Sequence, residues 1–244
     1  MGNDSEFRAP VALVTGATSG IGREVAHKLA ADGFSVLVHG RDAGRGAAVV
    51  EEIAKAGGRA RFISADLTGT GAIRRLAEQA GDVDVLVNNA GFSWFGPTAD
   101  LDPEIFDEMF AANVRSAYYL VAAIAPGMAK RGSGSIINLG SMAGQIGLAG
   151  GAAYSATKAA LASLTRSWAA EFSPQGVRVN TIAAGPAYTA GSSPDRIAAL
   201  GDTTLLARAA QPAEIADVIA FLASPKAGYI TGATIAADGG RTAV

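Results

Sequence analysis

The eight residues TGATSGIG, at positions 15–22, join a short apolar run to an amphipathic helical pattern. The run that precedes them is VALVT, and apolar residues follow at a spacing of four, at Ile21, Val25 and Leu29. Side chains at this spacing share one face of a helix, whereas a short β-branched run is typical of a strand. The segment therefore predicts a strand that passes directly into a helix.

The three glycines of this connection have separate uses. Gly16 can take the tight turn, Gly20 lets the backbone approach a pyrophosphate, and Gly22 lets the helix pack closely on the strand. The free N–H groups at the start of the helix then face the phosphates. Between a terminal strand and a helix, this pattern predicts a dinucleotide-binding turn.

Apolar β-branched runs recur along the whole chain, with helical patterns between them. Most of these runs are continuously apolar, which is typical of strands covered on both faces. Alternation of strand and helix indicates an α/β fold with a doubly wound, seven-stranded parallel sheet and helices on both faces. The expected strands are 11–15, 36–39, 61–65, 83–89, 135–139, 177–183 and 233–237.

One catalytic domain is expected over residues 10–244, after a disordered N-terminal tail at 1–9. No Pro/Ser-rich linker divides the chain, and no repeat of a solenoid period occurs. The stretch AGPAYTAGSSPDRIAALGDTT (184–204) has the composition of a loop, and a lid is expected at about 186–207.

Composition excludes several classes of function. Of the 244 residues, 49% are hydrophobic and 17% charged, but no apolar segment is long enough to span a bilayer, and the polar start is no secretory signal. The absence of cysteine excludes disulfides and thiolate chemistry, and favours a cytoplasmic protein. The net charge of −2 comes with no basic block, so nucleic acid is not an expected partner.

The end of the second strand bears on the choice of dinucleotide. An acidic side chain there binds the ribose 2′-hydroxyl of NAD, whereas an arginine accommodates the 2′-phosphate of NADP. This strand ends HGRD, so Arg41 stands near that position and favours NADP(H), with NAD(H) as the alternative. Asp42 comes one residue later and is expected to cap the next helix.

Tyr154 precedes Lys158 by four residues in the alanine-rich stretch AAYSATKAAL, so both lie on one face of a helix. A nearby ammonium favours the phenolate and lowers the pKa of a tyrosine, which makes Tyr154 a usable proton donor or acceptor. Ser141 follows the fifth strand, at the edge where open α/β sheets place reactive groups. Asn113 lies within a helical stretch, where asparagine is a poor helix former without a capping role.

Together with Asp66 in ADLT, NNAG (88–91) and the closing ITGATIAADGG, these motifs resemble the short-chain dehydrogenase/reductase family from Pro10 to Gly240. The resemblance implies a Rossmann-type sheet and hydride exchange between a nicotinamide and a carbonyl or alcohol carbon. It also implies that Ser141 polarises the substrate oxygen and that Tyr154 exchanges a proton with it. Lys158 would lower the tyrosine pKa and hold the nicotinamide ribose, and Asn113 would hold a water that links Lys158 to solvent.

The same resemblance implies the contacts of the cofactor. Asp66 would contact the adenine, Asn88 would lie beside the adenosine ribose, and Thr189 would touch the carboxamide. Relatives have proline where this chain has Ala184, and Pro186 follows two residues later. The other expected contacts are Gly16, Thr18, Ser19, Gly20, Ile21, Gly22, Arg41, Leu67, Ala90, Gly91, Tyr154, Lys158 and Pro186.

The segments after strands four to six supply the expected substrate pocket. Its lining is apolar and aromatic, which suits a hydrophobic ketone or an acyl chain better than a sugar phosphate. The alternative for Trp94 and Phe95 is packing at a subunit contact. The expected lining residues are Ser93, Trp94, Phe95, Met142, Gln145, Ile146, Leu148 and Tyr188.

The favoured activity is NADPH-dependent reduction of such a ketone or of a 3-oxoacyl substrate, and the chain is similar to 3-oxoacyl-carrier-protein reductases. Oxidation of a secondary alcohol is the alternative, and a non-catalytic NADP-binding sensor is a further one. Lys130 and Arg131 match one part of a carrier-protein docking patch, but FSPQG (172–176) has no basic residue for the other. Both a carrier-bound and a free substrate therefore stay open.

Other classes of activity lack their motifs. No G-x-S-x-G elbow or phosphate-binding G-x-x-x-x-G-K-[ST] loop occurs, and neither His27 nor His39 has a metal-ligand partner at a useful spacing, so no metal site is expected. The two long helices expected at 103–130 and 153–172 carry more small and apolar residues than one domain can bury. In the resembling family such helices pair between subunits, which implies a homotetramer, with a dimer as second choice.

Overall fold

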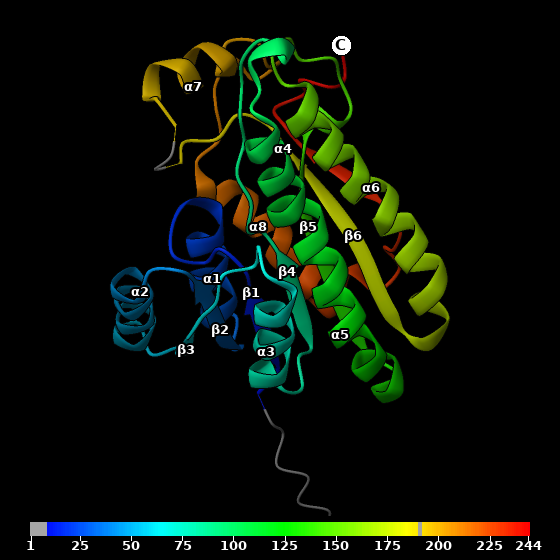
Figure 1. Cartoon of the computed structure of the whole chain (residues 1–244). Helices are drawn as coiled ribbons and strands as arrows, with labels where there is room; N and C mark the ends of the chain where they lie inside the picture. The colour runs from blue at the N-terminus through cyan, green and yellow to red at the C-terminus, as the bar shows by residue number, and fades with distance from the viewer. Residues whose placement is uncertain (1–8, 190–191) are drawn as a thin grey trace, which may run out of the picture.

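The computed structural model describes residues 9–189 and 192–244, and it is built on one parallel sheet (Figure 1). The sheet has seven strands in the order β3-β2-β1-β4-β5-β6-β7. The chain therefore winds outward from β1 in one direction and from β4 in the other. The strands are β1 (Val11–Val14), β2 (Ser35–Gly40), β3 (Arg59–Ser64), β4 (Val85–Asn88), β5 (Gly134–Ser141), β6 (Val177–Ala184) and β7 (Thr234–Ala237).

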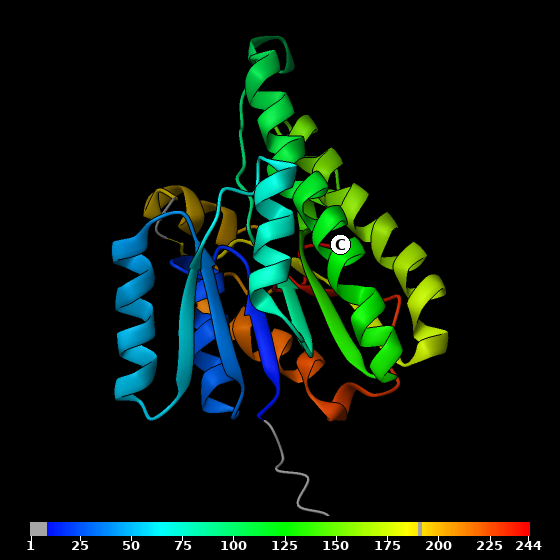
Figure 2. The ribbon, with the colours of Figure 1, turned by 60° about the horizontal axis from the view of Figure 1, so that its bottom comes forward.

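Helices cover both faces of the sheet, as Figure 2 shows from a second side. One layer contains α1, α2 and α8, and the other contains α3, α5 and α6. The helices are α1 (Gly20–Ala31), α2 (Ala43–Lys55), α3 (Thr70–Ala80), α4 (Pro103–Phe110), α5 (Ser116–Arg131), α6 (Ala152–Phe172), α7 (Pro194–Gly201) and α8 (Pro212–Ala223). Short 3-10 turns occupy Thr98–Asp100, Met142–Gly144, Ser173–Gln175 and Pro225–Ala227.

Each strand supplies side chains to both layers of the core. In β2, Val36 and Val38 pack toward α1 and α2, while Leu37 between them packs toward the opposite layer. Successive side chains of a strand point to opposite faces, so burial on both faces requires an apolar residue at nearly every position. This explains the continuous apolar runs and confirms the predicted doubly wound sheet and its seven strands.

Two predicted helical features differ from the structure. The expected helix 103–130 is interrupted by a π-helical segment, Ala111–Arg115, between α4 and α5. The stretch 184–204, of which residues 190–191 lie outside the described part, is not all loop, because β6 extends to Ala184 and α7 forms within it, starting with a proline at its first position. The predicted N-terminal tail falls almost entirely on residues 1–8, which lie outside the described residues.

The reversal of strand order between β1 and β4 determines where a ligand can bind. In open α/β sheets the crevice lies beyond the carboxyl ends of the strands at this reversal. The glycine connection follows β1 there, NNAG begins at the end of β4, and Ser141 ends β5. Over residues 9–189 and 192–244, no helix has the length and apolar character needed to cross a membrane.

Candidate active site

The glycine connection after β1 is too crowded for side chains. Gly16 has a φ of +65°, which favours glycine. Gly22 has no such conformation, but a Cβ at this position would lie 2.4 Å from the carbonyl oxygen of Gly16. The helix can therefore approach the strand end only if residue 22 lacks a side chain, as the sequence predicts.

The N-terminus of α1 opens toward this connection. Its N-cap, Ser19, makes no side-chain hydrogen bond to the first turn, and the first turn has no acidic residue. The N–H groups there lack a side-chain partner and carry the positive end of the helix dipole. Such an end suits the phosphates of a dinucleotide.

Asn89 holds the glycine connection in place and was not among the predicted site residues. Its Nδ2 donates to the carbonyl oxygens of Thr15, at 2.8 Å, and Gly16, at 3.1 Å. The Thr15 hydroxyl in turn accepts from the backbone N–H groups of Asn89 and Ala90, both at 3.0 Å. The position of Asn89 directly after a strand, opposite the end of β1, is the signal that could have identified it.

His39 is a second unpredicted support of the same connection. Its Nδ1 lies 3.3 Å from the N–H of Gly16, and its Nε2 lies 3.1 Å from the carbonyl oxygen of Ala65. A neutral ring protonated on Nε2 satisfies both contacts at once. Burial lowers the pKa of His39 to about 4, so the ring is neutral at ordinary pH.

The charged residues beyond β2 and β3 are arranged as expected. Asp42 caps α2, because its Oδ1 accepts from the N–H of Arg45 at 2.9 Å. Arg41 is exposed, and its charge helps to lower the pKa of Asp66, although hydrogen bonds from Thr68 contribute more. Arg41 and Asp66 thus lie near each other at the edge where the adenosine half of a dinucleotide is expected.

Asn88, predicted to lie beside the adenosine ribose, turns its side chain into the core. Its side chain is buried, and Nδ2 donates to Oδ1 of Asn138 at 2.9 Å, while its own Oδ1 has no partner. As the last residue of β4 it pairs with the neighbouring strand β5, whereas the side chain of Asn89 reaches the glycine connection. Leu67 is also buried.

Thr189 lies beside the glycine connection. A Cβ added at Gly20 would be 3.3 Å from Cγ2 of Thr189. The chain after β6 therefore returns to the N-terminus of α1, as a contact of Thr189 with the cofactor requires. The replacement of the usual proline by Ala184 does not prevent this approach.

Ser141, Tyr154 and Lys158 converge as the sequence predicts. The Ser141 hydroxyl lies close enough to the phenol of Tyr154 to influence its pKa. The Nζ of Lys158 lies 5.6 Å from the centre of the Tyr154 ring and donates to the carbonyl oxygen of Leu139 at 2.7 Å. Residues of β5 and of the first turns of α6 are thereby brought into one group.

The pKa of Tyr154 shifts in the direction opposite to the predicted one. Burial raises it, and the nearby Ser141 hydroxyl only partly opposes that rise. Lys158 is also buried, which lowers its pKa to about 8. Desolvation penalises the charged form of each group and outweighs the attraction that the sequence spacing suggested.

Asn113 lies at the centre of the π-helical segment. Its Oδ1 accepts from the N–H of Phe92 at 2.9 Å, and its Nδ2 contacts the Phe92 carbonyl oxygen at 2.8 Å and the Thr157 hydroxyl at 3.1 Å. The side chain therefore joins the chain after β4 to α6, one residue before Lys158. Its role in holding a water stays a prediction.

Part of the predicted substrate pocket gathers around Tyr154. The rings of Phe95 and Tyr154 have centres 5.5 Å apart, and a Cβ at Gly151 would contact both Phe95 and Leu148. Met142 is buried, whereas Ser93 and Gln145 are exposed. The other predicted members, Trp94, Ile146 and Tyr188, are partly buried.

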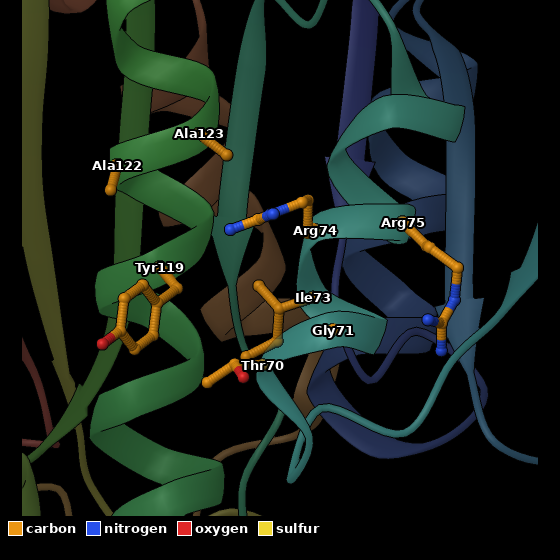
Figure 3. Close-up of a pocket in the computed structure, with 8 residues that line it drawn as sticks. All are labelled: Thr70, Gly71, Ile73, Arg74, Arg75, Tyr119, Ala122 and Ala123. Carbon is orange, nitrogen blue, oxygen red and sulfur yellow. The ribbon is translucent and has the colours of Figure 1, made fainter.

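A separate groove of about 730 Å³ lies between α3 and α5 and contains none of the predicted site residues. Figure 3 shows Arg74 extending from α3 toward α5. The lining residues are Thr70, Gly71, Ile73, Arg74, Arg75, Tyr119, Ala122 and Ala123. In the part of the chain that the structure describes, no cluster of side chains could hold a metal ion.

The chain matches a family model described as enoyl-(acyl carrier protein) reductase over residues 16–242. Two curated relatives are similar along almost their whole length. Cyclopentanol dehydrogenase of Comamonas sp. is 36% identical, over 96% of this chain and 97% of the relative. The 3-oxoacyl-[acyl-carrier-protein] reductase FabG of Staphylococcus aureus is 38% identical, over 94% and 96%.

Solved structures show the same similarity. A protein described as a short chain dehydrogenase/reductase family protein is 49% identical, with a TM-score of 0.89 over 96% of this chain and 98% of that one. A blue fluorescent protein from a metagenomic library, in complex with NADPH, is 35% identical, with a TM-score of 0.88 over 95% and 97%.

Proposed function

Because the chain belongs to the short-chain dehydrogenase/reductase family of oxidoreductases, we propose that it reduces a hydrophobic ketone or 3-oxoacyl compound with NADPH. The observation that carries the proposal is the convergence of Lys158, whose Nζ lies 5.6 Å from the centre of the Tyr154 ring, with the end of β5, where that Nζ bonds the Leu139 carbonyl oxygen two residues before Ser141. A proton donor, a hydroxyl for the substrate oxygen and a cation thus meet at the carboxyl edge of the sheet.

The three side chains have distinct tasks in a reduction. The Ser141 hydroxyl donates a hydrogen bond to the substrate oxygen as that oxygen gains negative charge. The phenolic O–H bond of Tyr154 breaks, its proton passes to the substrate oxygen, and a phenolate remains. The Lys158 ammonium favours this phenolate and so works against the burial that raises the pKa of Tyr154, without overcoming it in the free protein. When bound, the nicotinamide supplies the hydride for the carbonyl carbon.

The residues present fit a dinucleotide. The uncapped start of α1 can hold the pyrophosphate, because Gly20, its first residue, has no side chain and, among the described residues, only Thr189 lies near its α-carbon. Tyr154 and Lys158 lie where the nicotinamide ribose is expected, and Asp66 and Leu67 follow the strand on the adenosine side.

The residues that follow β2 support a preference for NADP(H). Arg41 is exposed there, while the nearest following carboxylate, Asp42, is engaged as the cap of α2. A guanidinium at this position pairs with a 2′-phosphate, whereas the ribose hydroxyl of NAD requires an acceptor. The similar structure in complex with NADPH supports the same choice.

The direction of the reaction is the finer part of the proposal. Reduction is favoured by the proposed NADP(H) preference and by the similarity to FabG. The similarity to a cyclopentanol dehydrogenase supports the reverse reaction, oxidation of a secondary alcohol, by the same residues. A non-catalytic sensor is disfavoured, because such a protein does not need Ser141, Tyr154 and Lys158 together.

A free ketone is proposed rather than a carrier-bound one. Arg131, one of the two basic residues at the end of α5, is paired with Asp82 at 2.8 Å. Lys130 alone then remains for an acidic carrier. A homotetramer is proposed because α5 exposes Tyr118 and Tyr119, and α6 exposes a row of small residues, at Ala152, Ala156, Ala159 and Ser163.

The proposal is tested by following oxidation of NADPH and of NADH with a panel of ketones that includes 3-oxoacyl thioesters. We expect ketone-dependent oxidation with NADPH preferred, and loss of that preference in Arg41→Ala. If both cofactors bind but no ketone is reduced, alcohol oxidation is tested next. Failure of both reactions would favour the sensor. Light scattering gives the oligomeric state.

A further inference from the structure

Arg196 of α7 lies over an aromatic ring that contacts Tyr154. Its guanidinium carbon is 4.4 Å from the centre of the Phe95 ring. The Phe95 ring in turn lies 5.5 Å from the Tyr154 ring, centre to centre, at an angle of 60°. Three segments far apart in the chain thus meet around Phe95, which contacts both Arg196 and the proposed proton donor.

Phe95 is a supported platform rather than a loose side chain. The N–H of Gly96, the next residue, donates to the carbonyl oxygen of Gly150 at 2.9 Å. A Cβ at Gly151 would lie 3.2 Å from Cε1 of Phe95, so the ring packs directly on the backbone that leads into α6. The ring over which Arg196 lies is therefore held in a defined relation to Tyr154.

The charge of Arg196 has no carboxylate partner in the described part of the chain. The ion pairs formed by other arginines, such as Arg208 with Glu214, have no counterpart at Arg196, which is exposed. Stacking on a ring holds the plane of the guanidinium but leaves its N–H groups free at the edge. Those N–H groups are suited to bind a carboxylate through two parallel hydrogen bonds.

The predicted pocket is uncharged, and Arg196, which was not among its predicted residues, brings a charge to one of its members, Phe95. None of the eight predicted lining residues is acidic or basic. A substrate whose carbonyl oxygen is at Tyr154 would extend past Phe95 toward the guanidinium. Because the Phe95 ring centre is 5.5 Å from that of Tyr154 and 4.4 Å from the guanidinium carbon, the guanidinium lies within reach of a substrate that places one ring or a short chain between its carbonyl and a second group.

We propose that Arg196 selects substrates that carry a carboxylate, or a similar anionic group, about one ring away from the reacting carbonyl. This inference rests on the proposed function and adds the class of substrate to it. Arg196 acts on specificity: it binds the far end of the substrate and does not take part in proton transfer.

The test uses three aryl ketones that differ only at the far end of the ring. They are 4-acetylbenzoate, the neutral 4-acetylbenzamide and acetophenone, each reduced with NADPH by the wild type, Arg196→Gln and Arg196→Lys. Arg74→Gln is the matched control, because Arg74 is an exposed arginine in the groove between α3 and α5.

We expect the wild type to prefer 4-acetylbenzoate, and Arg196→Gln to lower kcat/KM for it by at least ~10-fold, mainly through KM. For the two neutral ketones, kcat/KM of Arg196→Gln should stay within about twofold of the wild-type value, because these ketones lack the charge that Arg196 binds. Arg196→Lys should recover part of the preference, since it keeps the charge but not the planar fork. Arg74→Gln should resemble the wild type.

Two results would overturn the inference. One is a wild type with no preference for the carboxylate, and the other is an equal loss for charged and neutral ketones in Arg196→Gln, which indicates a structural role. If no ketone is reduced, the proposed function fails separately. In that case calorimetry measures the affinity of the wild type and of Arg196→Gln for 4-acetylbenzoate in the presence of NADP⁺. Equal affinities of the two proteins would reject the inference as well.

Discussion

Asn89 donates a hydrogen bond to the carbonyl oxygen of Gly16 across 73 residues of sequence, and thereby holds the cofactor turn against the end of β4. The same Nδ2 also reaches the carbonyl oxygen of Thr15. One amide group thus supports both residues at which the chain leaves β1.

We expect Asn89→Ala to weaken the binding of NADPH by ~10-fold or more, because two partly buried carbonyl groups lose their donor and the turn relaxes. Titration of cofactor fluorescence gives the dissociation constant. Gln175→Ala, which removes an exposed amide in a 3-10 turn, is the control and should bind normally. Normal binding by Asn89→Ala would show that the turn keeps its shape without this side chain.

Gly22→Ala should destabilise the protein although alanine is the better helix former. The added Cβ would lie 2.4 Å from the Gly16 carbonyl oxygen and 2.3 Å from Nδ2 of Asn89. Overpacking of this kind costs about 1–3 kcal/mol of the free energy of unfolding. Gly71→Ala in α3, where the Cβ meets only the end of Arg75, is the matched control and should be neutral or stabilising. Urea denaturation of both variants separates the two effects.

Tyr154→Phe should reduce kcat by at least ~100-fold, because the proton donor is lost. Cofactor affinity should change little, since the ring and Lys158 remain. Steady-state rates and a binding titration measure the two quantities on the same preparation. Turnover close to that of the wild type would remove Tyr154 from its assigned role.

Turnover in the reducing direction should fall as the pH rises above about 8, where Lys158 loses its proton. A neutral amine no longer stabilises the phenolate that Tyr154 forms. The dependence of kcat on pH measures this limb. A profile that stays flat up to pH ~10, the ordinary range of a lysine, would contradict the assignment.

Stability should decrease when the solution is acidified from pH 7 toward pH 4. The pKa of His39 is lowered from 6.5 to about 4, so in this window the unfolded chain binds a proton that the folded protein does not. Stability is therefore retained at neutral pH and is lost as the pH falls, by roughly 3 kcal/mol from this residue. Urea midpoints at pH 7 and pH 4 measure the effect.

The control for this prediction is the other histidine. His27 is partly exposed beside Glu52, so His27→Asn should keep the acid sensitivity of the wild type, whereas His39→Asn should reduce it. Equal sensitivity in His39→Asn and the wild type would assign the effect to carboxylates.

The sequence alone determined the order of strands and helices, the cofactor turn, and the presence of Ser141, Tyr154 and Lys158 at one edge of the sheet. These features depend on local periodicity and on residues close together in the chain. Burial on both faces produces continuous apolar runs, and a turn without space for side chains requires glycine, so each leaves a pattern that can be read directly.

Only the tertiary structure decided the side-chain directions and contacts that depend on packing between distant segments. It turned Asn88 into the core and Asn89 toward Gly16, placed His39 beneath the turn, and brought Arg196 over Phe95. It also reversed the expected shift in the pKa of Tyr154, because burial depends on the whole fold rather than on a neighbour four residues away. Desolvation and long-range contacts leave no periodic signal, so only the folded chain shows them.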